Sequence, residues 1–418
     1  MSFWHADTIR GSVQGRWISR VPPHAVFDAV TVDSREAGPR TVFVAIKGEK
    51  TDGHLYVKQA ADAGAPLVIV HDESAADAAT RARCGVLLVA ETGAALLKLA
   101  AAYRTFLDGT RVIAVGGSNG KTTTVRLVEA VLGTQLKGSA SKKSFNNAVG
   151  VPLTILAAKK GDQFLICEVG TNAPGEIAPL AAVIRPDVAV LTSIGREHLE
   201  GLGSLDGVIH EELTLFSALK PGGLAVLPAD VPELRGAVRR SKPIPEGAGV
   251  VWFGTAGDAD LRVSGVKTGE GGTTFRLNDR AEFVVPMAGA HNATNAAAAV
   301  AVARRLGIAE EMIRAGLGGA KGPPMRMERT SVGGVTFWND AYNANPDSML
   351  RSLETFFGLM AVSAGGRAVV VLGDMLELGP QGPALHAEVL RAAGVLAGGC
   401  GVETRFVLVG GLMAGAAA

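Results

Sequence analysis

The feature that most constrains the fold is a glycine-rich loop between an apolar run and a helical pattern. Residues 112–115 read VIAV, residues 116–124 read GGSNGKTTT, and residues 125–132 continue with a helical pattern. Glycines let several backbone N–H groups turn toward phosphate oxygens, and the N-terminus of the following helix adds partial positive charge. In this pattern Lys121 reaches the β- and γ-phosphates, and the Thr122 hydroxyl ligates Mg²⁺.

The loop departs from the commonest spacing, because its first glycine, Gly116, stands four residues before Gly120 and is preceded by Val115. The alternative explanation is a glycine-rich turn that carries an exposed lysine. Since a strand, a GKT sequence and a helix coincide here, the pattern favours an ATP site. The loop residues expected to bind ATP are Gly117, Ser118, Asn119, Gly120, Lys121, Thr122 and Thr123.

Short β-branched runs recur along the chain, each followed by a loop with Gly, Ser or Asn and then an Ala/Leu-rich segment. These runs are residues 41–46, 67–70, 112–115, 164–167, 188–191, 335–338, 368–372 and 406–409. Strands that alternate with helices predict an α/β protein with mainly parallel sheets. At about 150 residues per domain, the length predicts three α/β domains. We expect them at 1–107, 108–320 and 321–418: an N-terminal domain, a central ATPase-like domain and a Rossmann-like C-terminal domain.

The composition excludes several classes of protein. Hydrophobic residues make up 47% and charged residues 19% of the chain, which is enough for packed cores and argues against disorder. The net charge of +1 provides no global basic field for nucleic acid. The three cysteines lie far apart in the sequence and form no disulfide framework, which fits a protein of a reducing compartment. With no apolar leader and no run near the ~20 residues that span a bilayer, we expect a soluble cytoplasmic protein.

Acidic and histidine side chains follow the expected strands. Glu168 closes the apolar run at 164–167, at the sheet edge where ligands collect, and could hold Mg²⁺. A solvated strand-end acid is the alternative. His198 could bind a metal or a substrate, although a lone loop histidine often does neither. On spacing alone, Glu211 and Glu212 form a polar helix face.

Further motifs extend over nearly the whole chain. They are residues 33–35 (DSR), 43–48 (FVAIKG), 52–54 (DGH), 146–154 (NNAVGVPLT), 168–170 (EVG), 174–177 (PGEI), 198–201 (HLEG), 291–295 (HNATN) and Arg326. Together with the glycine-rich loop, they resemble the Mur ligases, ATP-dependent amide-bond-forming enzymes of peptidoglycan precursor synthesis. Residues 340–348 (DAYNANPDS) and 373–379 (GDMLELG) are more specific, and resemble the member of the family that adds D-Ala-D-Ala.

The resemblance implies a reaction in two steps. The terminal carboxylate of UDP-MurNAc-tripeptide attacks the γ-phosphate of ATP and gives an acyl phosphate, and the amine of D-Ala-D-Ala then displaces phosphate. Two anions must meet in the first step, so Lys121 and Mg²⁺ have to neutralise charge. No protein nucleophile is required, and catalysis is mostly positioning by a monomeric enzyme with small-molecule substrates.

The resemblance also implies roles for individual residues. The residues implied in catalysis are Lys121, His198, Glu212 and Arg326. Those implied in Mg²⁺ binding are Thr122, Glu168, His198 and Glu212. Those implied in contacts with adenine, phosphate and ribose are Asn292, Asn295, Arg326 and Asp340. Those implied at the uridine diphosphate are Ser34, Arg35, Lys47 and His54. Those implied along the rest of the substrate are Asn147, Thr171 and Asn172. Those implied at the acceptor dipeptide are Tyr342, Asn343 and Asn345. The C-terminal roles require that domain to close over the central one.

Two features depart from the family pattern. Glu212 occupies the position of a lysine that is carbamylated by CO₂ in the family, and we expect its carboxylate to replace the carbamate, directly or through a metal-bound water. A surface glutamate in a weakened homologue is the alternative. The family continues beyond Ala418 with a strand–helix portion that includes a Lys-Gly-Ser element, so we expect an open strand edge and uncovered apolar faces here. Either the chain is truncated or this member has a reduced third domain.

Two other functions stay open at this point. One is a sister ligase that adds a single amino acid to the growing peptide. The other is a nucleotide-binding, non-catalytic homologue, which Glu212 and the short third domain favour and the intact phosphate loop opposes.

Overall fold

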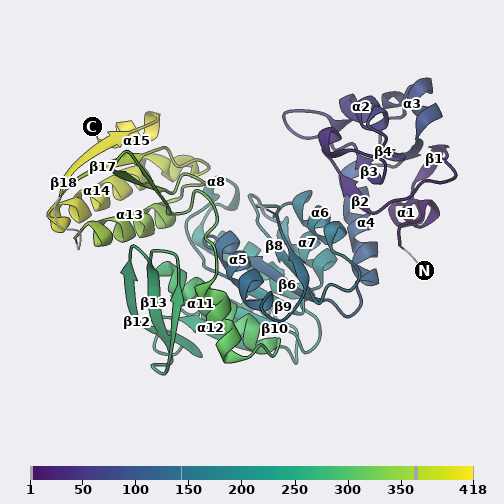
Figure 1. Cartoon of the computed structure of the whole chain (residues 1–418). Coiled ribbons are helices and arrows are strands. Elements are labelled where there is room, and N and C mark those ends of the chain that lie inside the picture. Colours follow the sequence, from purple (N-terminus) through teal and green to yellow (C-terminus); the bar gives the residue numbers. More distant parts are fainter. Residues whose placement is uncertain (1–2, 143, 362–365, 418) are drawn as a thin grey trace. The chain divides into compact units, whose positions relative to one another are not determined.

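A computed structural model describes residues 3–142, 144–361 and 366–417. Its contacts divide the chain into two compact units, which are described separately. Unit 1 comprises Met1–Val112, Gly138–Cys167 and Ala182–Ile184, and unit 2 comprises Ile113–Lys137, Glu168–Ala181 and Arg185–Ala418. Both units mix helices with sheets (Figure 1), so the predicted α/β class is confirmed.

Unit 1 contains a five-stranded sheet in the order β1-β5-β4-β3-β2, in which only β1 is antiparallel to its neighbour. Its strands are β1 (Arg16–Ser19), β2 (Ala29–Thr31), β3 (Thr41–Val44), β4 (Leu67–Val70) and β5 (Gly85–Leu88). The expected strand at 67–70 is confirmed, and the one expected at 41–46 is present but ends at Val44. Buried apolar side chains, including Phe43 and Val68, fill the space between this sheet and its helices.

The helices of unit 1 cover this sheet or connect it to a second, parallel pair of strands. The helices are α1 (Ala6–Val13), α2 (Val57–Asp62), α3 (Ala78–Arg83), α4 (Thr92–Phe106) and α6 (Gly150–Ala157). Short 3-10 helices are η1 (Ser34–Glu36), η2 (Gly53–Tyr56) and η3 (Glu73–Ala75). The parallel pair is β7 (Gly138–Ala140) with β8 (Phe164–Glu168). Helix α4 begins where the Glu91 carboxylate accepts hydrogen bonds from the backbone N–H groups of Gly93 and Ala94, which caps the helix.

The main sheet of unit 2 has the order β14-β13-β12-β11-β10-β9-β6. Its strands are β6 (Arg111–Gly116), β9 (Val188–Leu191), β10 (Leu224–Pro228), β11 (Gly249–Gly254), β12 (Leu261–Gly269), β13 (Gly272–Leu277) and β14 (Ala281–Val285). From β6 to β12 the strands are parallel, as predicted. Strands β12–β14 form an antiparallel meander that the sequence pattern did not predict.

Helices pack on both faces and ends of this sheet. They are α5 (Lys121–Leu132), α7 (Ile177–Ile184), α8 (Leu199–Leu202), α9 (Leu205–Leu213), α10 (Pro232–Ser241), α11 (His291–Arg305) and α12 (Glu310–Gly318), with the 3-10 helix η4 (Thr214–Ala218). Helix α11 packs on α5 and on the strands β10–β14 (Figure 1). Its buried alanines allow this close approach, so the alanine-rich segment is a core helix.

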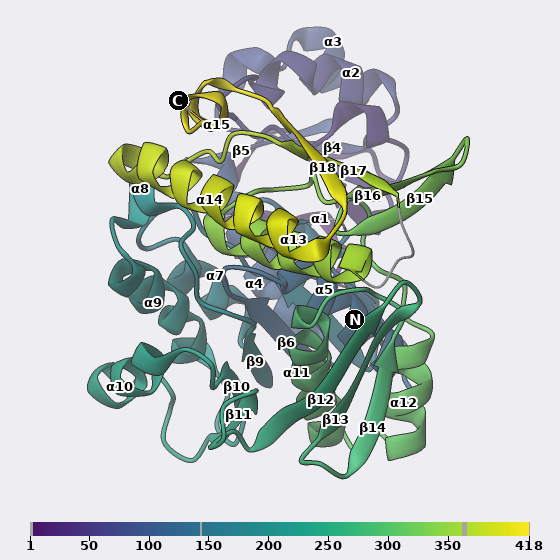
Figure 2. The same ribbon diagram turned by 90° about the vertical axis from the view of Figure 1, so that its left-hand side faces the viewer.

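The C-terminal part of unit 2 has two small sheets and three helices. An antiparallel hairpin joins β15 (Glu328–Val332) to β16 (Val335–Asn339), and β17 (Arg367–Leu372) pairs in parallel with β18 (Glu403–Leu408). The helices are α13 (Pro346–Ala361), α14 (Gly382–Cys400) and α15 (Gly411–Gly415), with η5 (Gly379–Gln381). Figure 2 shows α13 and α14 side by side, and both pack in one core with the inward residues of β17.

The outward face of the β17–β18 pair is apolar and exposed. Val369 and Val371 on β17 and Val407 on β18 all point away from the core, as the alternating burial of both strands requires. The expected uncovered apolar face is therefore present among the described residues. In the described ranges, no helix combines the length and apolar character that crossing a bilayer requires.

Candidate active site

The glycine-rich loop joins β6 to α5 as the sequence predicts. Gly117 has φ +114°, and a Cβ there would lie 2.4 Å from Thr192 Oγ1. Gly120 has φ +85°, and a Cβ there would lie 2.5 Å from Asn295 Oδ1. Both positions therefore require glycine for conformation and for space. The close approach at Gly120 places Asn295 of α11 directly against the loop.

The loop is held by the residues that follow β9. Ser118 N donates to Ser193 O (2.9 Å), and Asn119 N donates to Ser193 Oγ (2.8 Å). The Thr192 hydroxyl donates to Asn119 O (2.6 Å), while Gly195 N donates to Ser118 Oγ (2.8 Å). These bonds set the loop conformation before any nucleotide binds.

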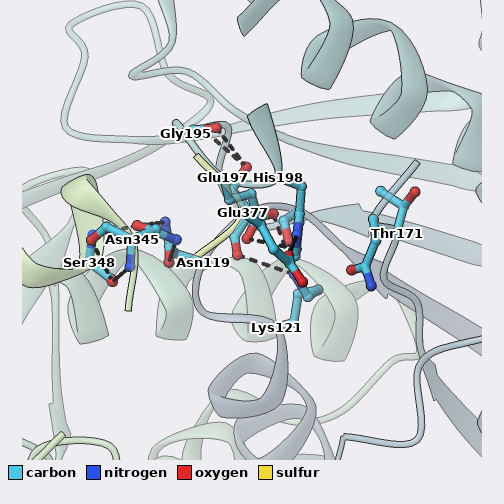
Figure 3. A network of polar contacts seen from close by, with 12 residues as sticks. Asn119, Lys121, Thr171, Gly195, Glu197, His198, Asn345, Ser348 and Glu377 are labelled. Atoms are coloured by element: carbon cyan, nitrogen blue, oxygen red, sulfur yellow. Dashed lines mark hydrogen bonds and ion pairs between the residues drawn. The ribbon is translucent and has the colours of Figure 1, made fainter. Parts of the chain in front are cut away.

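Lys121 is folded onto its own loop. Its Nζ donates to Gly117 O (2.5 Å) and Ser118 O (3.2 Å), and lies 3.7 Å from Glu197 Oε1. Figure 3 shows Lys121 directed toward Glu197 and His198. Glu197 is only 5% exposed. Burial raises the pKa of its carboxyl, and the Lys121 charge opposes that rise. Sequence reasoning missed Glu197, because a loop acid beside His198 carries no sign of burial.

Glu212 lies beneath the phosphate loop. This residue of α9 is 1% exposed, and its Oε2 accepts a hydrogen bond from Gly117 N (2.9 Å). Its Oε1 is buried and has no hydrogen-bond partner among the residues that the structure describes. Burial raises the pKa of Glu212 to about 8, although the nearby Lys121 charge lowers it. The alternative of a surface glutamate is therefore wrong.

Glu211, the neighbour of Glu212, is also buried. Its carboxylate accepts hydrogen bonds from the backbone N–H groups of Gly175 and Ile177, both at 2.8 Å. The interpretation of Glu211 and Glu212 as a polar helix face is wrong. The sequence shows two acids on one helix, α9. It does not show that the loops around Gly117 and Gly175 pack against this helix and donate backbone N–H groups to both carboxylates.

The raised pKa of Glu212 predicts a dependence of stability on pH. The unfolded chain releases this proton near the ordinary value of 4.5, whereas the folded protein keeps it up to about 8. Because the folded state binds more protons in that interval, the free energy of unfolding falls as pH rises through it. A Glu212→Gln variant keeps an acceptor but cannot titrate, so its stability should decline less over the same interval. Denaturant unfolding of the metal- and nucleotide-free proteins tests this, and parallel pH profiles would contradict it.

Glu168 and Thr122 lie close to the loop. Val169 N donates to Val115 O (2.8 Å), which places the end of β8 beside the strand that leads into the loop. Glu168 is 1% exposed, so the alternative of a solvated acid is wrong. The hydroxyl of Thr122 accepts a hydrogen bond from Arg326 Nη2 (3.3 Å). Across residues 3–142, 144–361 and 366–417, no three His, Cys, Asp or Glu side chains are grouped so that they could hold a metal ion.

His198 connects the phosphate loop to the C-terminal part of unit 2. It adopts φ +50° at the start of α8, and its Nδ1 is hydrogen-bonded to Glu377 Oε2. Its Nε2 lies 3.8 Å from Glu197 Oε2. The backbone of Glu377 also accepts a hydrogen bond from Glu200 N (3.0 Å). The HLEG and GDMLELG motifs, far apart in sequence, therefore contact each other (Figure 3).

A cavity of about 170 Å³ opens beside the phosphate loop. Seven of the predicted ATP-site residues line it: Asn119, Gly120, Thr123, Asn292, Asn295, Arg326 and Asp340. Two further residues that the sequence analysis did not place there, His291 and Arg351, line it as well. Burial, with a smaller contribution from the Arg351 charge, lowers the pKa of His291 to about 4.

The polar groups of this cavity are held in place. Asn292 Nδ2 donates to Ala288 O (2.8 Å), and Asn295 Nδ2 donates to Asn292 Oδ1 (3.4 Å). Asp340 accepts hydrogen bonds from Met327 N (3.0 Å) and from the Ser352 hydroxyl, and its pKa is raised by burial.

The residues predicted to border the dipeptide differ from one another in exposure. Tyr342 and Asn343 are exposed, and the Arg326 guanidinium lies 4.4 Å from the centre of the Tyr342 ring. Asn345 is buried: its Oδ1 accepts from Ser348 N (2.8 Å), which caps α13, and its Nδ2 donates to Asn119 Oδ1 (2.9 Å). The Asn345 side chain therefore bonds to the protein, between α13 and the phosphate loop.

The other predicted substrate residues make local contacts. In unit 2, Thr171 Oγ1 donates to Glu176 Oε2 (3.1 Å), and Asn172 N donates to the same oxygen (2.7 Å). In unit 1, Ser34 Oγ donates to Gln59 Oε1 (2.9 Å), and Asn147 Oδ1 accepts from Gly150 N (2.9 Å) at the start of α6.

The remaining predicted residues of unit 1 lie around two aspartates. Arg35 pairs with Asp33 (2.6 Å), and Lys47 forms a backbone bridge with Asp52. His54 is buried, with Nδ1 2.7 Å from Asp52 Oδ1 and Nε2 accepting from His71 N (3.1 Å). Both ring nitrogens of His54 therefore have partners within unit 1.

Three family models match the chain in succession. They are the Mur ligase family catalytic domain over residues 26–104, the Mur ligase middle domain over 115–303, and the Mur ligase glutamate ligase domain over 325–397. Together these matches cover most of the chain, and the middle-domain match includes the phosphate loop, Glu168, His198 and Glu212.

Named relatives and solved structures agree with these models. UDP-N-acetylmuramoyl-tripeptide--D-alanyl-D-alanine ligase of Bacillus subtilis is 38% identical over 87% of this chain and 77% of its own length. The enzyme of the same name from Escherichia coli is 32% identical over 93% of this chain and 82% of its own length. A crystal structure of MurF from Acinetobacter baumannii superposes with a TM-score of 0.88 at 29% identity, covering 99% of this chain and 87% of that one. MurF from Thermotoga maritima in complex with ADP gives a TM-score of 0.77 at 28% identity, covering 93% and 90%. The chain therefore belongs to the Mur ligase family.

Proposed function

We propose that this ligase uses ATP to join D-Ala-D-Ala to UDP-MurNAc-tripeptide through an acyl phosphate. The observation that carries the proposal is that the two motifs typical of the D-Ala-D-Ala-adding member contact the phosphate loop and the neighbouring His198. Asn345 of the DAYNANPDS motif is bonded to Asn119, and Glu377 of the GDMLELG motif is bonded to His198. Two relatives at 38% and 32% identity carry that activity in their names.

The chain's own residues support such a mechanism by position and charge. The N-terminus of α5 would present its backbone N–H groups and partial positive charge to bound phosphates, and Lys121 can leave its loop carbonyls to bind them. Asn292, Asn295 and Asp340 line the nucleotide cavity, and Arg326 extends to Thr122 from the C-terminal part of the chain. The positive charges of Lys121 and Arg326 would lower the repulsion between ATP and the substrate carboxylate.

We propose Thr122, Glu168, His198 and Glu212 as the residues that would hold Mg²⁺. Three of these four donors suit the ion, because the Thr122 hydroxyl and the Glu168 and Glu212 carboxylates offer hard oxygen ligands. The buried Glu212 Oε1, which has no partner among the described residues, would find one in the ion or its water. Magnesium in such sites is often held by one or two carboxylates together with phosphate oxygens, so a cluster of three acidic side chains is not needed. Bound Mg²⁺ would supply positive charge at the transferred phosphoryl group.

Glu212 leads to a prediction about carbon dioxide. If its carboxylate stands in for the lysine carbamate of the family, the enzyme should be fully active in CO₂-free buffer and unaffected by bicarbonate. A Glu212→Lys variant restores the family residue and should need bicarbonate for activity. Amide formation by both proteins, measured with and without bicarbonate, tests the idea. Strict dependence of the unmodified enzyme on bicarbonate would contradict it.

The proposed activity is tested by measuring ADP release and amide product with UDP-MurNAc-tripeptide, ATP and Mg²⁺. D-Ala-D-Ala should give product, whereas single amino acids should not. Product from a single amino acid instead would favour the sister ligase. ATP binding without turnover on either acceptor would favour the non-catalytic homologue.

The organisation into three domains, 1–107, 108–320 and 321–418, is part of the same proposal. Each proposed domain contains one of the three family matches, at 26–104, 115–303 and 325–397. We further propose a cytoplasmic monomer without a nucleic-acid partner, since its proposed substrates are soluble nucleotides and a dipeptide.

A further inference from the structure

Arg196 lies in the loop after β9 and binds two acids from the C-terminal part of the chain. Its Nε and Nη2 donate to Asp347 Oδ1 (3.1 and 2.8 Å), and its backbone N donates to Asp347 Oδ2 (2.7 Å). Its Nη1 donates to both oxygens of Glu388 (3.0 and 2.9 Å). Asp347 is in the first turn of α13 and Glu388 is on α14, so one guanidinium joins two helices to one loop.

This arrangement is stronger than an ordinary surface ion pair. The planar guanidinium offers several fixed donors, and charge-assisted bonds to two carboxylates use most of them. The Arg196 side chain is partly buried, and both partners raise its pKa, which is opposed by desolvation. The backbone N–H of Arg196 adds a further bond to Asp347, which does not depend on the arginine side chain.

The loop that carries Arg196 also contacts the phosphate loop. Gly195 N donates to Ser118 Oγ, and the next residues, Glu197 and His198, lie beside Lys121. A Cβ at Gly195 would lie 2.7 Å from Asp347 Oδ2, which shows how closely the C-terminal helix approaches. The loop is therefore packed between the phosphate loop on one side and α13 and α14 on the other.

Apolar contacts extend this junction. Leu199 and Leu202 of α8 belong to the same buried cluster as Met375 and Leu378 of the GDMLELG segment. The Asn119–Asn345 bond belongs to the same part of the structure, so polar and apolar contacts together hold Asn345 next to the phosphate loop (Figure 3).

We propose that Arg196 is a positioning residue that fastens the acceptor-binding part of the chain to the phosphate loop, so that the acyl phosphate meets the acceptor amine before it meets water. The inference rests on the proposed function. In the productive step, the amine nitrogen forms a bond to the acyl carbon, the C–O bond to phosphate breaks, and the amine loses a proton. In the wasteful step, water oxygen attacks instead and returns the carboxylate and inorganic phosphate.

The productive and wasteful steps differ in the number of phosphates released per amide formed. A loss of folded protein would lower both quantities equally and leave this ratio unchanged. The intact enzyme should release one phosphate per amide formed. In Arg196→Ala the C-terminal part is held less tightly, so phosphate per amide should rise about twofold or more, and the KM for D-Ala-D-Ala should rise about tenfold. The matched control is Arg304→Ala, which removes a similar ion pair with Glu310 (2.7 Å) that lies within the central part of the chain. Its ratio and KM should equal those of the intact enzyme.

Gly195→Ala provides a second test that keeps every charged group. Its methyl would displace the Asp347 carboxylate and should shift the ratio in the same direction, while Gly358→Ala, an exposed position in α13 with open space for a methyl, should not. Suppose that the intact enzyme releases one phosphate per amide formed. If Arg196→Ala and Gly195→Ala then both keep this ratio and the KM for D-Ala-D-Ala, the role of Arg196 is refuted. If the intact enzyme makes no amide at all, the proposed function fails instead.

Discussion

Replacement of Lys121 by alanine should lower the rate of amide formation about 10³-fold or more, because the cation proposed to bind the phosphates is lost. In the structure the ammonium group of Lys121 is bonded to Gly117 O and Ser118 O and lies 3.7 Å from Glu197 Oε1. Without it, the substrate carboxylate would have to approach ATP against the full repulsion of two anions. Steady-state ADP release and amide product, measured with both substrates, test this expectation.

The buried Glu197 makes a control necessary. Loss of Lys121 leaves this acid without its cationic partner, so part of the effect could come from destabilisation. The double variant Lys121→Ala/Glu197→Gln removes that charge and should recover stability without recovering activity. Substitution of Lys267, an exposed lysine on β12, should change neither property. An active Lys121→Ala enzyme would contradict the whole mechanism.

Replacement of Gly117 by alanine should destabilise the protein and abolish ATP binding. The positive φ costs an L-residue about 1–2 kcal/mol, and overpacking adds about 1–3 kcal/mol. A methyl at this position would meet Thr192 Oγ1 at 2.4 Å and two backbone nitrogens, those of Thr192 and Ser193, at 2.8 and 2.9 Å. Backbone atoms cannot rotate away as a side chain can. The change would also disturb the N–H that bonds Glu212.

Gly109→Ala is the matched control for this prediction. Gly109 has φ +84° and open space where a Cβ would stand, so only the conformational cost applies there. Denaturant unfolding should show a smaller loss of stability for Gly109→Ala than for Gly117→Ala, and calorimetry should show ATP binding only in the former. Equal losses would mean that the contacts with Thr192 and Ser193 do not matter.

Local pattern predicted several elements closely. The strand at 67–70 coincides with β4, that at 188–191 with β9, and the phosphate loop lies between β6 and α5. These elements are readable because a buried parallel strand is a short apolar run, and because GKT must follow a strand and begin a helix. The antiparallel β12–β14 meander escaped prediction, since its strands alternate buried residues with more exposed ones and lack the continuous apolar runs of the parallel strands.

The sequence by itself determined the phosphate loop, the α/β class and the motifs of the family, because each depends on neighbouring residues along the chain. Only the tertiary structure decided the burial of Glu197, Glu211 and Glu212, the engagement of Asn345 by Asn119, and the joint binding of Arg196 by Asp347 and Glu388. Those last two partners lie 151 and 192 residues from Arg196 in the chain. Periodicity reports which face of an element is apolar, but it carries no information about which distant element packs against that face.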